Sequence, residues 1–328
     1  MVVVGTWNLE NLYRPGGGFG PDDDAAYEAK LSALADTINR LAPDVLGVQE
    51  IGDPEALADL IERLKGKWGD PLLSEHPDGR GIRVGVLSRF PATVLSDVVD
   101  FRPEMPPLRA DDSGAQSTRM GRGALAVRVK PARGKTLDVA VCHLKSKLLT
   151  FPGGRFNPRD EAERARYGAY ALNRRAAEAA TVRGLADDLI DGKGEKRAVV
   201  VLGDLNDEPQ AATTQILLGP PGSELGTAAA SRSDQGDAWR LWNLAPLLPD
   251  DQRYSRVHRD RPELIDHILV SHALLGRVEE VHSEVGGKAS GEAGGKTSAE
   301  LPSIGNDPGA RRGEPGSDHA PILARLAL

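Results

Sequence analysis

The stretch GDLND, at residues 203–207, places two carboxylates and an amide directly after the apolar run AVVVL. Asp204 and Asn206 alternate with Leu205, so their side chains point to the same side of an extended strand end. A carboxylate there can orient or deprotonate a water molecule, and a carboxamide can donate a hydrogen bond to an oxygen that gains charge in a transition state. A divalent cation and a phosphate at this spot would explain why acidic groups crowd together. An Asx turn leading into Pro209 is the alternative, and it does not exclude the first interpretation.

Polar side chains stand at other predicted strand ends as well. They are Asn8 in TWNLEN, Glu50 in VQE, His143 in CHLKS, Asp266 with His267 in LIDHI, and Asp318 with His319 in GSDHAPI. Any one of them alone most often caps a turn or faces water. In open α/β sheets, however, ligands bind where strand ends converge. Together with GDLND, these ends therefore predict one common site.

Glu50 is the best candidate for a metal ligand. It follows the apolar residues of VLGVQE, where an unpaired buried carboxylate is costly. Mg²⁺ takes oxygen ligands, usually one or two carboxylates together with waters and phosphate, so coordination would relieve that cost. A salt bridge to an arginine is the alternative.

His143 and His319 are the candidate imidazoles. His319 follows an aspartate and can act as a general base or stabilise charge on a phosphate. Asp266 is the natural candidate to hold its tautomer, because it also ends a strand. Cys142 next to His143 suggests a cysteine–histidine dyad, but adjacent residues on a strand point to opposite faces. This geometry predicts that Cys142 lies in the core.

The elements that must position these side chains alternate between strand and helix patterns. Strand patterns cover VVVGTWNL near the start and residues 44–50, 83–90, 92–99, 123–129, 136–144, 198–202, 264–270, 276–283 and 319–328. Helical patterns cover residues 27–41, a segment starting at Asp53-Pro54, and about residues 160–191. Four consecutive strand patterns without a helix indicate antiparallel pairing, so we expect mixed sheets.

Two stretches, residues 103–122 and 284–317, are rich in Gly, Ser, Pro and Asp, as flexible loops are. Neither separates two self-sufficient halves. The first and last strands must both be buried, so we expect one domain over residues 1–328 that carries two mobile loops. No internal repeat with a fixed period is present.

The composition excludes several classes of protein. With 328 residues and 40% apolar content, the chain can build a sizeable core. Its net charge of -7 argues against a broad basic face for wrapping nucleic acid, although a local basic groove can be hidden in that average. The single cysteine excludes an internal disulfide framework.

No apolar run approaches the roughly 18 residues of a membrane span. MVVVGTWNLEN lacks the features of a signal peptide, so a cytoplasmic location is the default expectation. A secreted protein without its leader would look the same.

Six motifs together resemble those of a known superfamily. WNLEN, VQE, HLKSK, GDLND, LIDHILVSHAL and GSDHAPI follow one another between Asn8 and His319. Each motif alone is weak, but the ordered set resembles the endonuclease/exonuclease/phosphatase superfamily. It includes DNase I-like nucleases, AP endonucleases, inositol polyphosphate 5-phosphatases and bacterial sphingomyelinases. The resemblance implies a four-layer α-β-β-α sandwich of two mixed β-sheets with outer helices. It also implies hydrolysis of phosphoesters with Mg²⁺ or Mn²⁺.

The resemblance further implies which residues hold the metal and the substrate. Glu50 would be the principal metal ligand, with Asn8 beside it and Asp318 nearby. Arg122 lies where related nucleases place an arginine that contacts phosphate, and Arg119 is close enough to compete for this role.

The same resemblance implies catalytic roles. Asp204 would orient the attacking water, and Asn206 would hold a phosphate oxygen. His319, paired with Asp266, would act as base or phosphate stabiliser, and His143 would contact the phosphate from the opposite side. Some relatives give this last histidine an acidic partner, which the sequence does not identify. Glu75 and Asp78 are candidates.

The choice among phosphoesters is less constrained. Residues 143–183 carry an excess of Lys and Arg that suits a phosphate-rich substrate, although a solvated helix face with pairs such as Arg174 and Glu178 is an equal alternative. Our first interpretation is a metal-dependent nuclease or phosphodiesterase acting on DNA, RNA or nucleotide phosphodiesters by in-line water attack. The alternative is a phosphatase or phospholipid phosphodiesterase of the inositol-phosphate or sphingomyelinase type. A binding protein without activity is disfavoured, because the metal and water groups are all present. The sequence indicates no protein partner and no stable insertion into a membrane.

Overall fold

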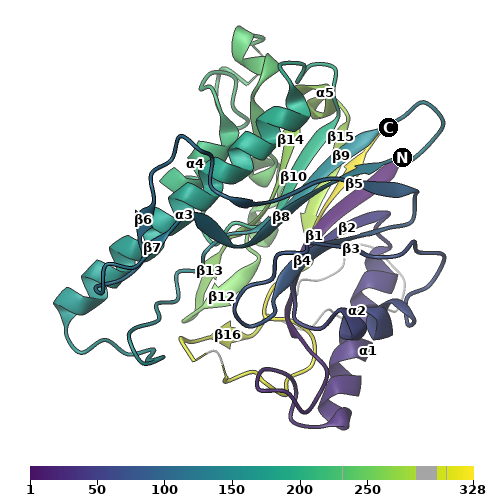
Figure 1. The fold of residues 1–328 in the computed structure, drawn as a ribbon. Helices are drawn as coiled ribbons and strands as arrows, with labels where there is room; N and C mark the ends of the chain where they lie inside the picture. Colours follow the sequence, from purple (N-terminus) through teal and green to yellow (C-terminus); the bar gives the residue numbers. More distant parts are fainter. Residues whose placement is uncertain (231, 286–300, 308) are drawn as a thin grey trace.

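The computed structural model describes all residues except 231, 286–300 and 308. Its centre consists of two six-stranded sheets (Figure 1). In spatial order, the first sheet contains β15 (Val278–Ser283), β17 (Ile322–Leu326), β1 (Val2–Leu12), β2 (Val45–Ile51), β4 (Arg83–Ser88) and β3 (Leu72–Leu73). The second contains β11 (Leu241–Asn243), β14 (Asp266–Ser271), β10 (Val199–Asp204), β9 (Leu137–His143), β8 (Arg119–Val129) and β5 (Ala92–Asp100). Both sheets are mixed, because β1–β2 and β9–β10 pair in parallel and their other strands pair antiparallel.

Helices cover the outer faces of the two sheets. These helices are α1 (Asp24–Leu41), α2 (Pro54–Ile61), α3 (Glu161–Ile190) and α4 (Ala212–Leu218), whereas Leu274 of the short helix α5 (His272–Leu275) packs into the core between the sheets. Apolar residues of α1 and α2 form one core with the first sheet, and those of α3 form another with the second sheet. A third core fills the space between the sheets. The resulting order is helix, sheet, sheet, helix, so the predicted four-layer sandwich is confirmed.

Strand β10 shows why its apolar run forms a central strand. Val200 and Leu202 face the other sheet, whereas Val199 and Val201 pack beneath α3. Successive side chains of a strand point to opposite faces, so a strand covered on both faces must be apolar at every position. The first polar residue of the run is Asp204, the last residue of β10.

Aspartates fix the starts of the two longest helices. Asp23 accepts a hydrogen bond from the Ala26 amide at 2.8 Å, and Asp160 accepts one from the Glu163 amide at 2.7 Å. Each cap satisfies an amide that has no partner in the first helical turn. Helix α1 ends at Leu41, and the next residue, Ala42, adopts a left-handed conformation before Pro43.

Short elements differ from the expectations. A small sheet joins β13 (Arg261–Glu263), β12 (Arg256–His258) and β16 (Ser303–Ile304). The expected loop at 103–122 contains a ladder of β6 (Leu108–Arg109) with β7 (Gln116–Ser117), and β8 begins inside it, at Arg119. The second expected loop, 284–317, contains β16, and part of it lies outside the described residues. Within the described part of the chain, no helix is long and apolar enough to cross a membrane.

Candidate active site

Strand pairing brings the predicted side chains to one end of both sheets. Strands β9 and β10 run in parallel, and their last residues, His143 and Asp204, are register partners. Strand β14 runs antiparallel to β10, so its first residue, Asp266, pairs with Asp204. His319 precedes β17, which runs antiparallel to β1 in the first sheet. Antiparallel strands thus contribute their starts where parallel strands contribute their ends.

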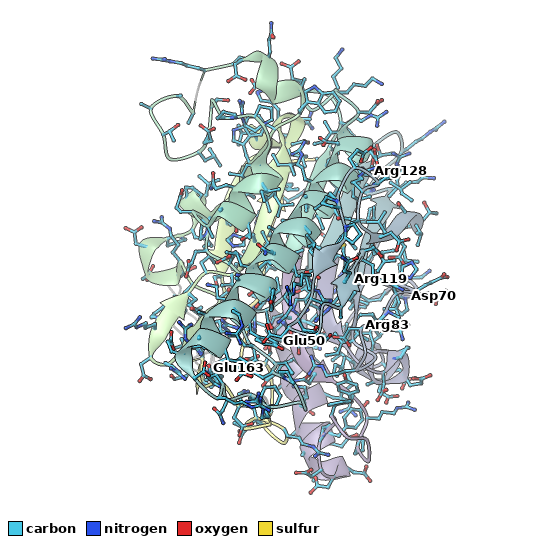
Figure 2. All side chains as sticks on the ribbon, turned by 60° about the vertical axis from the view of Figure 1, so that its left-hand side comes forward. Glu50, Asp70, Arg83, Arg119, Arg128 and Glu163 are labelled. Atoms are coloured by element: carbon cyan, nitrogen blue, oxygen red, sulfur yellow. The ribbon has the colours of Figure 1, made fainter. Side chains whose placement is uncertain are left out.

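One cavity of about 750 Å³ lies at this end of the molecule. The predicted residues that line it are Asn8, Glu50, His143, Asp204, Asn206, Asp318 and His319. Figure 2 shows that Glu50 lies in the lower half of the molecule. Glu163, near the start of α3, lies in the same half, whereas Arg128 lies in the upper half. The structure therefore joins Glu50 and His319, from opposite ends of the sequence, in a single cavity. Asp266 and Arg122 lie behind its wall.

Asp204 contacts side chains from both sheets. Its Oδ2 atom accepts a hydrogen bond from Asn8 Nδ2 at 3.1 Å and lies 3.4 Å from His143 Nε2. Its Oδ1 atom accepts from the Asn206 amide at 2.9 Å, while the Asn206 side chain donates to the Leu144 carbonyl at 3.0 Å. Burial, together with the negative charge of Asp266, raises the pKa of Asp204 to about 7. A carboxylate of this kind can take a proton from water at neutral pH.

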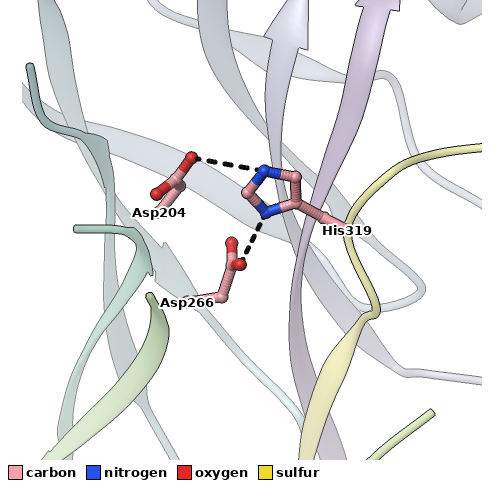
Figure 3. A group of neighbouring side chains, drawn as sticks. All are labelled: Asp204, Asp266 and His319. Atoms are coloured by element: carbon pink, nitrogen blue, oxygen red, sulfur yellow. Dashed lines mark hydrogen bonds and ion pairs between the residues drawn. The ribbon is translucent and has the colours of Figure 1, made fainter. Parts of the chain in front are cut away.

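Asp266 and His319 form a buried pair (Figure 3). His319 Nδ1 lies 2.7 Å from Asp266 Oδ2, and His319 Nε2 lies 4.0 Å from Asp204 Oδ2. Burial alone would lower the pKa of His319, but the carboxylates of Asp266 and Asp318 outweigh it and raise this pKa to about 10. The imidazole is therefore cationic. Its Nδ1–H donates to Asp266, and its Nε2–H points toward Asp204.

His143 is held in the opposite charge state. Its Nδ1 atom lies 2.6 Å from Arg122 Nη1, and Arg122 Nη2 lies 3.2 Å from Asp78 Oδ2. Burial and the neighbouring Arg122 cation hold the pKa of His143 well below its ordinary value. The imidazole is neutral, so Nδ1 accepts from Arg122 and Nε2–H faces Asp204. Of the two candidate acidic partners, Asp78 acts through Arg122, whereas the Glu75 amide donates to Asp97.

Arg122 thus contacts His143 and is not among the residues that line the cavity. Its contact with a phosphate remains a prediction. Arg119 is exposed at the start of β8 and does not line the cavity.

The oxygen atoms along the first sheet suit a hard divalent cation. Asn8, Glu10, Glu50 and Asp318 all line the cavity with carboxylate or amide oxygens. Glu50 Oε2 accepts from the Asn11 amide at 2.9 Å, and Glu10 Oε2 accepts from the Asp318 amide at 2.9 Å. Burial and the charge of Asp318 raise the pKa of Glu10 to about 7, although Lys30 and Arg311 act in the opposite direction. A bound Mg²⁺ or Mn²⁺ would stabilise the charged form of this carboxylate, and these residues fit it.

A second acidic group is less suited to a metal. Asp204, Asp266 and His319 bring one ligand atom each within 4.8 Å of one another. A metal ligand needs a neutral imidazole, whereas His319 is held as a cation by Asp266. This group is better suited to proton transfer and charge stabilisation.

Glu10 was not among the predicted site residues. Glu10 lies two positions after Asn8 in the motif TWNLEN, and alternate residues of a strand share a face. That spacing was the signal that could have identified it. Arg311 pairs with Glu10 at 2.8 Å, from a glycine-rich segment whose sequence gives no such signal.

Six Lys and Arg side chains border the cavity among the described residues, and only two belong to the predicted basic segment 143–183. They are Lys147 and Arg164 from that segment, and Arg80, Arg256, Arg259 and Arg311 from elsewhere. Lys147 pairs with Asp207 at 3.2 Å and Arg256 with Glu263 at 2.6 Å. Much of the positive excess at 143–183 is also neutralised locally, as in the pairs of Arg155 with Glu163 and Arg174 with Glu178. The basic character of the site therefore comes from several segments, not from α3 alone.

Known proteins show which family and fold the chain shares. The model of the Endonuclease/Exonuclease/phosphatase family matches residues 5–319. The chain belongs to this family. Comparison of this endonuclease/exonuclease/phosphatase family member with curated proteins gives no match.

Solved structures share the fold of this family member at low sequence identity. The human Nocturnin catalytic domain with bound sulfate anion is 16% identical, with a TM-score of 0.52 over 99% of this chain and 94% of that one. Mannosyl-6-phosphatase of Bacteroides thetaiotaomicron is 15% identical, with a TM-score of 0.54 over 100% of both chains. Truncated TDP2 of Caenorhabditis elegans is 15% identical, with a TM-score of 0.54 over 99% of this chain and 97% of that one. At these identities the likeness shows a common fold.

Proposed function

We propose that this family member is a divalent-metal-dependent phosphoesterase, namely a nuclease or phosphodiesterase that hydrolyses DNA, RNA or nucleotide phosphodiesters by in-line attack of water. The observation that carries the proposal is that Glu50, Asp204 and His319 line one cavity although they lie far apart in the sequence. A carboxylate of raised pKa, Asp204, beside the His319 imidazolium is what water activation and charge stabilisation on a phosphate require.

In this proposal, different residues of the cavity bind the metal and activate the water. Asn8, Glu50 and Asp318 would hold Mg²⁺ or Mn²⁺, with Glu10 beside them, and the metal would supply positive charge next to a phosphate oxygen. Asp204 orients the attacking water and accepts its proton, because its pKa is close to neutral.

The remaining groups act on the phosphate. Asn206 donates its second amide hydrogen to a phosphate oxygen, since the first is bound to Leu144. His319 donates from Nε2–H while Asp266 holds Nδ1, and His143 donates from the second sheet. Donors thus approach the phosphate from opposite sides of the cavity.

A phosphatase is the second candidate. The solved structure of a mannosyl-6-phosphatase shares this fold over its full length, so the same scaffold accommodates a monoester. The cavity of about 750 Å³ and its cations on several segments favour a substrate larger than one phosphate group, which supports the diesterase.

A substrate panel tests the proposal. Plasmid, single-stranded DNA, RNA, inositol phosphates, mannose 6-phosphate and sphingomyelin are each incubated with the protein and Mg²⁺ or Mn²⁺. Cleavage of nucleic acid faster than release of phosphate from the monoesters is expected. Turnover of only the monoesters or of sphingomyelin would refute the nuclease proposal and leave the phosphatase or phospholipase alternative.

A further inference from the structure

A second, smaller cavity adjoins the candidate active site. Its volume is about 280 Å³, and it shares lining residues with the larger cavity, namely Glu10, Asn11, Arg80, Phe156, Arg311 and Glu314. Cavities that bind complete small-molecule ligands measure about 300–1,000 Å³. The smaller cavity therefore suits one ring system of a substrate whose phosphate occupies the larger cavity.

Two exposed aromatic rings border the small cavity. Phe19 has 48% of its surface exposed and Phe156 has 43%, whereas most large apolar side chains of this protein are buried. The Phe19 ring lies 5.8 Å from the Tyr13 ring, centroid to centroid, which supports it from one side. Exposed aromatic faces beside an active site offer a platform for planar groups.

The loop that carries Phe19 is fixed by contacts with the segment preceding Asp318. Arg312 donates from Nε to the Gly20 carbonyl at 2.6 Å and from Nη2 to the Gly17 carbonyl at 2.9 Å. These hydrogen bonds hold the backbone before and after Phe19. A platform that is positioned before binding loses less entropy when a ligand stacks on it.

Arg80 lies at the border between the two cavities. Its guanidinium lies 5.8 Å from the centroid of the Phe19 ring, and its side chain makes one hydrogen bond, to Asn11 Oδ1 at 3.3 Å. Within the described residues no ion pair joins it to a carboxylate, in contrast to Arg311, which is paired with Glu10. Arg80 therefore retains donors that can contact a phosphate in the larger cavity.

We propose that the small cavity is a nucleobase subsite, in which the base next to the scissile phosphate stacks on Phe19 and Phe156 while Arg80 contacts that phosphate. The inference rests on the proposed phosphodiesterase function and names its substrate class as nucleoside phosphodiesters. Aromatic rings together with a guanidinium suit a planar base of any identity, so the subsite confers little base preference.

Ligand binding tests the subsite without turnover. Calorimetry with Ca²⁺ present measures binding of thymidine 5′-monophosphate, inorganic phosphate and mannose 6-phosphate to the full chain. Stacking of one base strengthens binding by roughly fivefold or more, so the nucleotide is expected to bind at least that much more tightly than phosphate. Phe19→Ala and Phe19→Leu should bring the ratio of the phosphate Kd to the nucleotide Kd toward one. A ratio near one in the wild type, or mannose 6-phosphate binding as tightly as the nucleotide, would overturn the subsite.

A pair of esters with the same leaving group separates this inference from the proposed function. Thymidine 5′-(4-nitrophenyl) phosphate carries a base and methyl 4-nitrophenyl phosphate does not. The ratio of kcat/KM for the thymidine ester to kcat/KM for the methyl ester should be high for the wild type. It should fall roughly fivefold or more in Phe156→Ala. It should stay high in the control Leu172→Ala, an exposed position on α3 outside both cavities. Hydrolysis of both esters at equal kcat/KM overturns the subsite alone. Hydrolysis of neither overturns the proposed function, and the binding ratios then decide the subsite.

Discussion

Asp204 links the two halves of the site. It accepts a hydrogen bond from Asn8 of the first sheet and lies beside His143 of the second. The sequence predicted its position, because the apolar run of β10 ends at this residue. The sequence did not predict its charge environment, which depends on Asp266 from an antiparallel strand 62 positions later and on the packing of the two sheets.

The raised pKa values predict how pH affects metal binding. Burial raises the pKa values of Asp204 and Glu10 to about 7, so in EDTA their protonated forms stabilise the fold. That contribution is present below their ordinary pKa values, near 4, and is lost as the pH rises through about 7. Mg²⁺ should therefore raise the melting temperature more at pH 8 than at pH 5.5, where protons compete with it. Thermal melts with Mg²⁺ or EDTA measure this difference, and an equal or larger shift at pH 5.5 would contradict it.

Arg122 should affect all substrates alike. Because it holds His143 neutral and oriented, Arg122→Met should lower kcat/KM roughly 10- to 100-fold for plasmid and for bis-p-nitrophenyl phosphate. Raising the pH should not restore the rate if orientation is what is lost. A loss confined to plasmid would indicate instead that Arg122 contacts the nucleic acid directly, as the resemblance implied.

At the scale of elements, long periodic segments were predictable and short ones were not. The run AVVVL and the helical pattern at 160–191 have enough residues to show their periods. The strands β12, β13 and β16 contain two or three residues each, too few to show alternation. They are specified by pairing with one another, which the local sequence does not reveal. For the same reason Arg256 and Arg311 were missed, since Arg256 begins the short strand β12 and Arg311 lies in a turn outside the strands and helices.

Helix α3 allows a test of how much its N-terminal cap stabilises the fold. Asp160→Ala removes the hydrogen bond to the Glu163 amide and should lower the free energy of unfolding by about 1 kcal/mol. Asp188→Ala on the same helix removes only an exposed ion pair with Arg102 and should change it by less than about 0.5 kcal/mol. Urea unfolding compares the two variants, and equal effects would show that the cap does not stabilise the helix.

At the scale of the whole molecule, the first and last strands complete one sheet. Strand β17 pairs with β1 over its full length, so neither end of the chain can leave without exposing the core between the sheets. This pairing supports the proposal of a single domain over residues 1–328. Cations from several segments surround the cavity although the net charge is -7, which the composition alone could not reveal.

A single domain should unfold cooperatively. Trp7 packs in the core beneath α1, and Trp242 packs between the sheets, so tryptophan fluorescence reports on both. Urea transitions followed by fluorescence and by far-ultraviolet circular dichroism should coincide. Two separated transitions would show that the sheets unfold independently.

The measurement that tests the central claim most directly is hydrolysis of bis-p-nitrophenyl phosphate by the wild type and by Asp204→Asn, with Mg²⁺ or Mn²⁺ and then with EDTA. The wild type should turn over with metal, lose activity in EDTA and regain it when metal is restored. Asp204→Asn, which keeps the shape of the side chain, should be roughly a thousandfold slower, whereas Asp188→Asn on the exposed face of α3 should match the wild type. Undiminished activity in EDTA, or a rate of Asp204→Asn within tenfold of the wild type, would contradict the account.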